Sequence, residues 1–479
     1  MKRLKLLAVF AAVLLCLQSC GIIIINNVDG KETVTTAEDD TQEGTDTNEV
    51  KEIVVDKKTS DEMKKNADDT LQQLDALKYS GMRILVAATD TLFYEGDGSA
   101  TPLTSDRVVR ADKIKEKLDA TVNVVSFSEE DLYNKLKAAV KKKEYFADVI
   151  AVPISLVGSL IADGLVKSLR TVPGLDLKAD YFSADALNAF SAGHGTYALS
   201  GEGCFEPEKI YCIYFNKELA KQLGYDMYSL VSDGEWTLEK YVECAAAASS
   251  AGKGTAVVKE NVKYERMLLS GSGFDFANSG MDKTPYANTF TEEYKNKVEL
   301  LSTLQRPFRS DSPADTFTAG GVLFCIDTVF AAEEMADSSV VWGMLPFPKY
   351  NKDGEYGSYI SDDAVVLCIP EYAADDRMSG DLIEALFASS TEYIKYDFLY
   401  HNMLDVLRDN GSVNSLNVIM NNPNYDFVIA MRSGYPTLYS NTAGAFSDLI
   451  SKELTFEKYK EKEAEVTEYS EKWFPVMYK

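Results

Sequence analysis

Short apolar runs alternate with amphipathic stretches along the chain from about residue 80 onward. A run of four or five mostly apolar residues is typical of a strand that is buried on both faces of a parallel sheet. Runs of this kind are residues 84–88, 122–125, 149–152, 322–326 and 365–369. We therefore predict five buried strands.

Helices are predicted between these strands. After Ser128, a good helix N-cap, apolar residues recur every four positions, and a similar stripe follows Thr291. A leading helix is predicted over residues 60–79, because Thr59 and Glu62 fit a capping box and leucines follow at helical spacing. Strands that alternate with helices predict an α/β fold, whose ligand sites lie at the carboxyl ends of the strands.

The first twenty residues indicate export. Three basic residues precede an apolar run at residues 6–17, which is too short to cross a bilayer and is typical of a secretory signal. Residues 17–21, Leu-Gln-Ser-Cys-Gly, resemble a bacterial lipobox, in which cleavage before the cysteine leaves its thiol to carry a diacylglyceryl group. We expect a signal peptide at residues 1–19 and a lipid anchor on Cys20, which would hold the protein on the extracytoplasmic face of the cell membrane. An ordinary signal peptide with an incidental cysteine is the alternative.

Residues 20–59 are polar and acidic, with no apolar period beyond residues 22–25. Such a composition does not supply a core, so we predict a disordered tether between the anchor and the folded part.

Charge and histidine content exclude several classes of protein. The chain has 49 Lys and Arg against 75 Asp and Glu, and a formal net charge of -26 repels the phosphate backbone of a nucleic acid. Only two histidines, His194 and His401, are present, so zinc sites built on histidine clusters are excluded. The sequence also lacks a Gly-x-Ser-x-Gly elbow, a Walker-type phosphate loop and a twelve-residue calcium loop. We predict no catalytic residues, no metal and no cofactor.

Cysteine usage leaves one question open. Cys16 leaves with the signal peptide and Cys20 carries lipid, so five cysteines remain and at least one thiol stays free. A disulfide between Cys204 and Cys212 is one alternative, and two free thiols are the other.

Four groups of motifs occur in a characteristic order. The first joins Ala147–Ile150 to Asp163–Val166, the second joins Gly195–Ser200 to Ile213–Leu219, the third is Glu235–Glu239, and the fourth joins Phe317–Gly321 to Trp342–Pro348. Over about residues 80–479 this order resembles the extracellular solute-binding proteins of family 1, the maltose-binding-like receptors of ATP-binding-cassette importers.

The resemblance implies a type II periplasmic-binding-protein fold, in which two α/β lobes are joined by a hinge and close on a ligand in the cleft between them. Lobe 1 would take residues 80–209 and about 358–412, and lobe 2 about 210–357 and 413–479. The chain would cross between the lobes near residues 200–211 and 356–361. It also implies a monomeric receptor that captures a sugar or oligosaccharide and delivers it to the permease subunits of the importer.

Candidate ligand contacts follow predicted strands or match positions where the family has a stacking aromatic residue. By the resemblance, Phe330 and Tyr439 would stack on a sugar ring, and simple packing is the alternative for each. Asp90 and Asp327 follow strands, where a carboxylate can accept hydrogen bonds from sugar hydroxyls or can cap a helix. The remaining candidates are Thr89 and Ser155, which follow strands, and Arg432, for which a surface ion pair is the alternative.

Other functions stay open at this stage. The cargo of the same fold could be a peptide, a polyamine or an anion, and a receptor of this kind could signal to a sensor instead of feeding a permease. A secreted glycosidase would need two carboxyl groups facing each other across a cleft. Asp362 with Asp363, or Asp375 with Asp376, are nominal pairs, but adjacent acids are more typical of solvated loops.

Overall fold

The computed structural model describes residues 60–74, 79–96, 98–99, 101–258, 264–280 and 283–473, together with two short strands near the N-terminus. The chain forms two compact units, residues 1–59 and 60–479. In the first unit, β1 (Ile24–Val28) pairs antiparallel with β2 (Lys31–Thr35), a hairpin inside the segment that the sequence predicted to be a tether. The predicted signal peptide and Cys20 lie outside the described residues.

The second unit contains two main sheets, and the first has four strands in the order β16-β5-β3-β4. β3 pairs parallel with β4 and β5, and β16 pairs antiparallel with β5. The strands are β3 (Arg83–Ala88), β4 (Thr121–Ser126), β5 (Val149–Pro153) and β16 (Val365–Cys368). All four were predicted from apolar runs.

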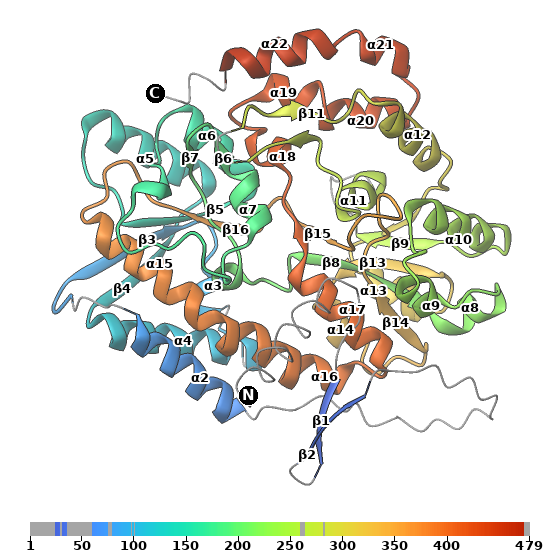
Figure 1. Ribbon diagram of the computed structural model, residues 1–479, viewed down its shortest axis with the longest axis horizontal. Helices are drawn as coiled ribbons and strands as arrows, with labels where there is room; N and C mark the ends of the chain where they lie inside the picture. The colour runs from blue at the N-terminus through green and yellow to red at the C-terminus, as the bar shows by residue number, and fades with distance from the viewer. Residues whose placement is uncertain are drawn as a thin grey trace, which may run out of the picture. The chain divides into compact units, whose positions relative to one another are not determined.

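The second sheet has the order β12-β9-β13-β8-β15-β17, and β14 also pairs with β8. Its strands are β8 (Ile210–Asn216), β9 (Thr255–Val258), β12 (Phe308–Ser310), β13 (Phe324–Thr328), β14 (Trp342–Leu345), β15 (Ser358–Ile360) and β17 (Pro423–Asn424). In Figure 1 the strands of the first sheet lie on the left and β8, β9, β13 and β14 lie on the right. The two sheets confirm the predicted α/β class.

The chain passes between the sheets at least four times. Leu199 forms a bridge to Leu367 of β16 in the first sheet, and Ile210 then begins β8 in the second. β15 ends in the second sheet at Ile360, and β16 begins in the first at Val365. The third passage leads from β16 to α17 (Asn410–Asn421), which packs against β14 of the second sheet, and to β17. The fourth follows β17, because α18 (Phe427–Met431) packs against the first-sheet helix α6 (Val157–Ala162). The sequence predicted passages near residues 200–211 and 356–361, and its lobe bounds placed another at residues 412–413.

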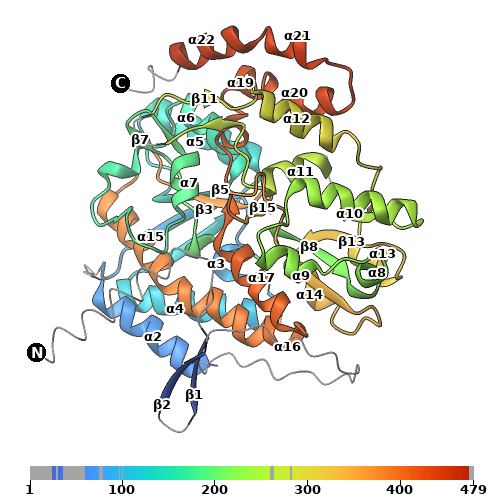
Figure 2. The same cartoon turned by 45° about the vertical axis from the view of Figure 1, so that its right-hand side comes forward.

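Helices cover both sheets. The principal ones are α2 (Ser60–Gln73), α4 (Pro102–Leu118), α5 (Glu129–Lys142), α7 (Ala184–Ala189), α8 (Lys217–Gln222), α9 (Met227–Ser232), α10 (Leu238–Ser250), α11 (Tyr264–Gly271), α12 (Glu292–Leu301), α13 (Pro313–Thr318), α15 (Asp376–Ser390), α17 (Asn410–Asn421), α19 (Pro436–Ser440), α20 (Ala443–Ile450), α21 (Phe456–Lys460) and α22 (Glu463–Trp473). In Figures 1 and 2, α21 and α22 lie at the top of this unit.

The predicted helix starts are present. Ser128 accepts a hydrogen bond from the backbone N–H of Asp131 at the start of α5, and Thr291 accepts one from that of Tyr294 at the start of α12. These caps satisfy backbone donors that have no partner within the helix.

One long helical stretch contacts helices near the first sheet at its start and a helix of the second sheet near its end. It begins as α15, which packs against α2 and α4, and continues through two π-helical segments, η4 (Thr391–Tyr396) and η5 (Phe398–Met403). The second π-helical segment contacts α14 (Ala331–Glu334), which follows β13 of the second sheet.

Candidate functional site

A cluster of charged side chains lies where the chain passes from β15 to β16, and Asp362 is at its centre. Arg266 of α11 donates through Nη2 to Oδ2 of Asp362 at 2.8 Å, and Arg432, just after α18, donates through Nη1 to the same oxygen. The hydroxyl of Tyr359 donates to Oδ1 of Asp362 at 3.4 Å. The cluster therefore joins α11 on the second sheet, the passage itself and a helix that packs on the first sheet.

The cluster is largely shielded from water. The side chains of Arg266 and Asp362 are 10% and 13% exposed, whereas that of Arg432 is 31% exposed. Burial works to lower the pKa of Arg266, but the Asp362 carboxylate outweighs it, so the pKa lies above its ordinary value. Arg432 is the member of the cluster that offers the most exposed donors to a ligand.

Two of the seven sequence candidates meet at Asp362. Ser155, in the turn that follows β5, donates its backbone N–H to the carbonyl oxygen of Asp362 at 3.0 Å, and Arg432 binds the carboxylate. The structure thus places the carboxyl end of a first-sheet strand next to the charged cluster.

The candidates that follow β3 make local contacts. Thr89 donates its backbone N–H to the carbonyl oxygen of Ala151 at 2.9 Å. Asp90 accepts a hydrogen bond from the backbone N–H of Leu92 at 2.8 Å, at the start of α3 (Leu92–Glu95). The N-cap residue of α3 is Thr91, which makes no side-chain cap, so this contact of Asp90 is a local turn before the helix.

The other three candidates lie on separate elements. Asp327 lies on β13 opposite Cys212, and its carboxylate accepts the backbone N–H of Thr328 at 2.8 Å. Phe330 is half-buried and precedes α14. Tyr439, also half-buried, lies on α19 and packs against the core at the start of α20. Their role as ligand contacts stays a prediction.

Sequence reasoning missed the centre of the cluster. It treated Asp362 and Asp363 alike, as acids of a solvated loop, but only Asp363 fits that interpretation. Asp363 is 58% exposed and pairs with Lys209 at 2.5 Å. The available signal was position, because Asp362 falls inside the short link between two predicted extended stretches, where a passage between lobes was expected.

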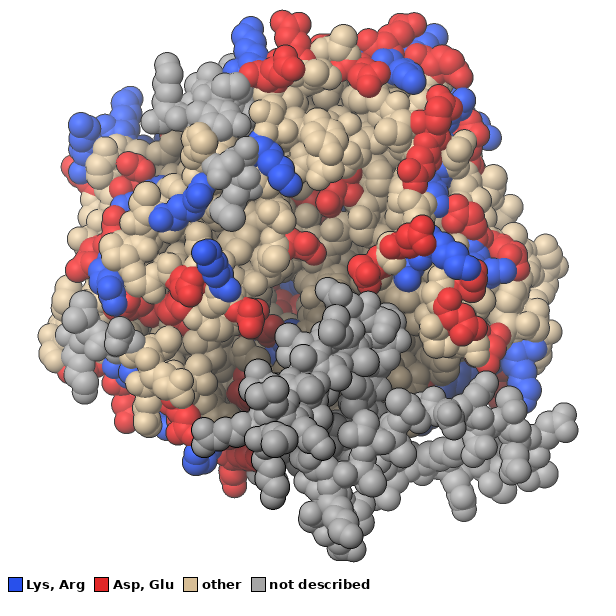
Figure 3. Space-filling view, in the orientation of Figure 1, with Lys and Arg blue, Asp and Glu red and all other residues tan. Residues whose placement is uncertain are grey.

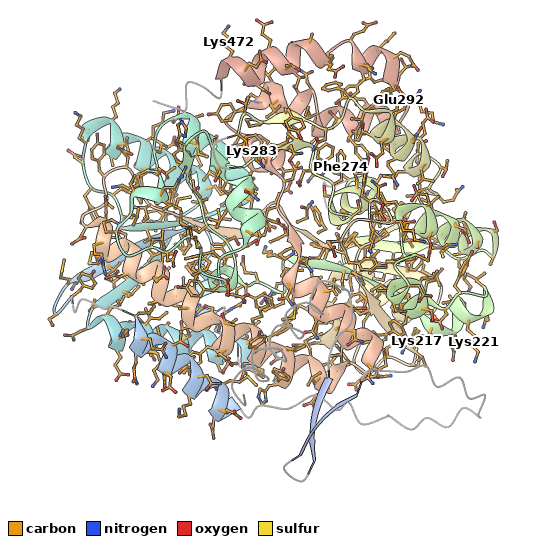
Figure 4. All side chains as sticks on the ribbon, viewed as in Figure 1. Lys217, Lys221, Phe274, Lys283, Glu292 and Lys472 are labelled. Atoms are coloured by element: carbon orange, nitrogen blue, oxygen red, sulfur yellow. The ribbon has the colours of Figure 1, made fainter. Side chains whose placement is uncertain are left out.

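Most aromatic side chains belong to the core. Phe274, labelled in Figure 4, stacks on Tyr294 with ring centroids 5.4 Å apart and also contacts Tyr350. Trp236 is fully buried, and its indole N–H donates to the carbonyl oxygen of Pro346 at 3.0 Å. The high aromatic content is therefore mainly structural.

The described cysteines are all buried free thiols. Cys204 lies in a short 3-10 turn, whereas Cys212 lies inside β8, and the structure shows no disulfide between them. Within the described residues, no group of three or more metal-binding side chains is placed to hold a metal ion. Nor does that part of the chain contain a helix long and apolar enough to cross a membrane.

A cavity of 530 Å³ lies beside β8 and β15, on the face opposite to the Asp362 cluster. Ile210 and Ile360 line this cavity and pair with each other across the strands. Their neighbours Tyr211 and Tyr359, also paired, point to the opposite face because side chains alternate along a strand. Tyr359 contacts Asp362, so the cavity and the charged cluster lie on opposite faces. None of the seven sequence candidates lines the cavity.

Comparison with known proteins identifies the class. The sequence profile of the bacterial extracellular solute-binding proteins matches residues 110–397, which is more than half of the chain. This protein therefore belongs to that family. Among curated proteins, none matches the chain.

Solved structures share the fold at low sequence identity. The sugar-binding protein MalE from Xanthomonas citri is 13% identical, with a TM-score of 0.55 over 82% of this chain and 99% of its own. A family 1 extracellular solute-binding protein from Bifidobacterium longum subsp. infantis is 12% identical, with a TM-score of 0.54 over 81% of this chain and 100% of its own. The cyclic alpha-maltosyl-1,6-maltose binding protein from Arthrobacter globiformis is 13% identical, with a TM-score of 0.54 over 81% and 98%. These likenesses confirm the predicted two-lobed solute-binding fold.

Proposed function

We propose that this protein is a lipid-anchored receptor that captures a carbohydrate between its two lobes and delivers it to the permease of an ATP-binding-cassette importer. The lobes would follow the two sheets, and the passages between the sheets would form the hinge. The observation that carries the proposal is the Asp362 cluster, which draws on both sheets at the ends of their strands.

The cluster has the chemistry for a polyhydroxylated ligand. A guanidinium presents several donors in a fixed plane and a carboxylate presents acceptors, so the pair can bond adjacent hydroxyls of one sugar. Arg432 would supply donors, and its partner Asp362 would hold it in place. The structural neighbours support a sugar as cargo, because one is described as a sugar-binding protein and another as binding cyclic alpha-maltosyl-1,6-maltose.

A ligand screen tests the proposal. The mature chain carrying Cys20→Ser would be heated with mono- and oligosaccharides, and with peptides and anions as controls. A bound ligand at 100 times its Kd stabilises the fold by ~2.7 kcal/mol, which raises the Tm measurably. A saccharide that raises the Tm and is recovered intact by chromatography supports a receptor. If only a control compound raises the Tm, the carbohydrate assignment is wrong, and a cleaved saccharide would indicate an enzyme.

The lipid anchor has its own test. In a bacterial host that processes lipoproteins, Cys20→Ala should move the protein from the membrane fraction to the soluble fraction. Cys16→Ala is the matched control, because Cys16 lies in the predicted signal peptide and should leave the distribution unchanged. Membrane retention of the Cys20→Ala protein would contradict the anchor.

A further inference from the structure

The 530 Å³ cavity is distinct from the site proposed for the sugar. It lies on the face of β8 and β15 that carries Ile210 and Ile360, away from Asp362. Its volume is within the ~300–1,000 Å³ that small-molecule sites occupy. Figure 3 shows a hollow near the centre of the face drawn, with acidic and basic side chains around it.

Segments from both sides of the passages form its walls. Residues 177–187, which include the start of α7, form one wall, and residues 420–425 around β17 form another. The first passage, with Glu202 and Glu206, lies between them. A ligand in this cavity would therefore contact elements associated with both sheets.

The charged groups of the wall are mostly acidic. Asp180, Asp185, Glu202 and Glu206 line the cavity, against two lysines, Lys178 and Lys395. Lys395 is already engaged, because its ammonium group donates to Glu202 at 2.7 Å and to the side-chain oxygen of Asn421 at 2.6 Å. Acidic residues therefore outnumber basic ones in the cavity wall by four to two.

Glu206, a buried residue of the cavity wall, has a carboxyl oxygen that lacks a hydrogen-bond partner among the described residues. The residue is 2% exposed, and its Oε2 accepts the backbone N–H of Val365 at 2.8 Å. Its Oε1 has no hydrogen-bond partner among the described residues. A buried carboxyl oxygen without a partner costs free energy, and a cationic donor in the cavity would relieve that cost.

Aromatic side chains complete the wall. Tyr181, Phe182, Phe205 and Tyr425 line the cavity together with Ile210, Ile360 and Met420. Aromatic faces attract cations and cover apolar carbon chains equally well. The lining therefore suits a compact molecule that combines a positive charge with an apolar body.

We propose that this cavity is a second binding site, which takes a small organic cation such as an aliphatic amine or a quaternary ammonium compound. The cation would lie against the aromatic wall, with its charge toward the acidic residues. Because the cavity and the Asp362 cluster lie on opposite faces of the same strands, both sites can be occupied at once.

Calorimetry tests the site with defined probes. The mature chain carrying Cys20→Ser would be titrated with putrescine, spermidine and choline, and with 1,4-butanediol as an uncharged match for putrescine. At least one cation should bind with one-to-one stoichiometry, and butanediol should not bind. Absence of binding by all three cations would overturn the proposal, and equal binding of butanediol would overturn its charge basis.

Two variants test whether the cation binds in this cavity. Glu206→Gln keeps the shape and an acceptor for Val365 but cannot ionise. It therefore removes the carboxylate that a bound cation would favour, and the affinity for the cation should fall at least tenfold. Ala184→Trp, at an exposed position of α7 in the cavity wall, should block binding even if Glu206→Gln fails to fold. Asp363→Asn, away from the cavity wall, is the control and should bind as the parent does. If both cavity variants bind the cation as tightly as the parent, the proposal is wrong.

Discussion

Two neighbouring aspartates illustrate how surroundings decide the role of a residue. Asp362 is 13% exposed and binds two arginines, whereas Asp363 is 58% exposed and binds one lysine. Removing one partner of a buried charge network leaves the other charges unpaired at a cost of ~3–5 kcal/mol, while an exposed pair contributes ~0–1 kcal/mol. Asp362 should therefore contribute much more to the stability of the fold than Asp363.

We expect Asp362→Asn to lower the free energy of unfolding by about 2 kcal/mol or more, since an amide keeps a hydrogen bond but not the charge. Asp363→Asn should lower it by less than about 1 kcal/mol. Urea unfolding followed by circular dichroism measures both. Equal losses in the two variants would show that Asp362 does not organise the cluster.

Glu206 should make stability depend on pH. Burial raises its pKa to about 8, and the carboxylates of Glu208 and Asp90 add to the shift, while the Val365 N–H and Arg107 oppose it. A carboxyl group with a raised pKa binds more protons in the folded state, so its contribution to stability is complete below the unfolded pKa. That contribution is lost as the pH rises through about 8.

The variant Glu206→Gln isolates this effect, because its amide does not titrate. Between pH 6 and 9, we expect the variant to gain stability relative to the parent as the pH rises. Other buried carboxyls with raised pKa values, such as Asp106 and Asp275, titrate in both proteins and cancel in the difference. A difference in unfolding free energy that stays constant over this range would contradict the raised pKa of Glu206.

At the scale of elements, the docking of α18 on α6 depends on two glycines. A Cβ atom on Gly158 of α6 would lie 2.6 Å from the carbonyl oxygen of Met431, at the end of α18. One on Gly434 would lie 2.0 Å from the carbonyl oxygen of Gly158. The backbones therefore approach more closely than any side chain allows, and this contact holds the segment that follows β17 against the first sheet.

Gly158→Ala should lower the free energy of unfolding by ~1–3 kcal/mol, because overpacking forces the two backbones apart. Gly321→Ala is the matched control, since a Cβ atom there has no neighbour within 4 Å, and it should change stability by less than ~0.5 kcal/mol. Chemical denaturation of both variants checks the prediction. If Gly158→Ala leaves the free energy of unfolding unchanged, α18 can shift away from α6 without a loss of stability.

The elements also show what a sequence reveals. Continuous apolar runs predicted the four strands of the first sheet, because strands buried on both faces need such runs. β8 is buried along all seven of its residues, Ile210–Asn216, yet its mixture of tyrosine, cysteine and asparagine hides the run. β17 has only two residues, too few for any periodic signal, so the sequence did not predict this strand.

The site was less predictable than the fold. Asp362 binds Arg266 and Arg432, which are 96 and 70 residues away in sequence, and no local pattern connects them. The cavity was unpredictable for the same reason, because its walls come from distant stretches of the chain near residues 180, 205 and 422. Spacing along the chain reports neighbours on one element, whereas these sites are made by packing between elements.

At the scale of the whole molecule, the passages should act as a hinge that closes on a ligand. The long helix that contains η4 and η5 contacts elements on both sides of these passages, so it must adapt when the lobes move. π-helical turns are frequent at functional sites in helices. Closure should therefore be measurable as a change in distance between helices that pack on different sheets.

The buried cysteines make this measurement practical. Burial raises the pKa of Cys244 to about 12 and that of Cys212 still higher, so the native thiols should not react with maleimide dyes. Lys142→Cys on α5 and Lys221→Cys on α8 add two exposed labelling sites, one near each sheet, in a chain that carries Cys20→Ser. Figure 4 labels Lys221.

A saccharide that binds this doubly labelled protein should shift its single-molecule energy transfer to a new value, with an occupancy that follows the calorimetric binding curve. Asp362→Asn should reduce the shifted population at the same saccharide concentration, and Asp363→Asn should not. Putrescine alone, which would bind on the opposite face of β8 and β15, should not produce the energy-transfer value that the saccharide produces. If calorimetry detects saccharide binding while energy transfer stays constant, the protein binds its ligand without closing, and the hinge assigned to the passages between the sheets is wrong.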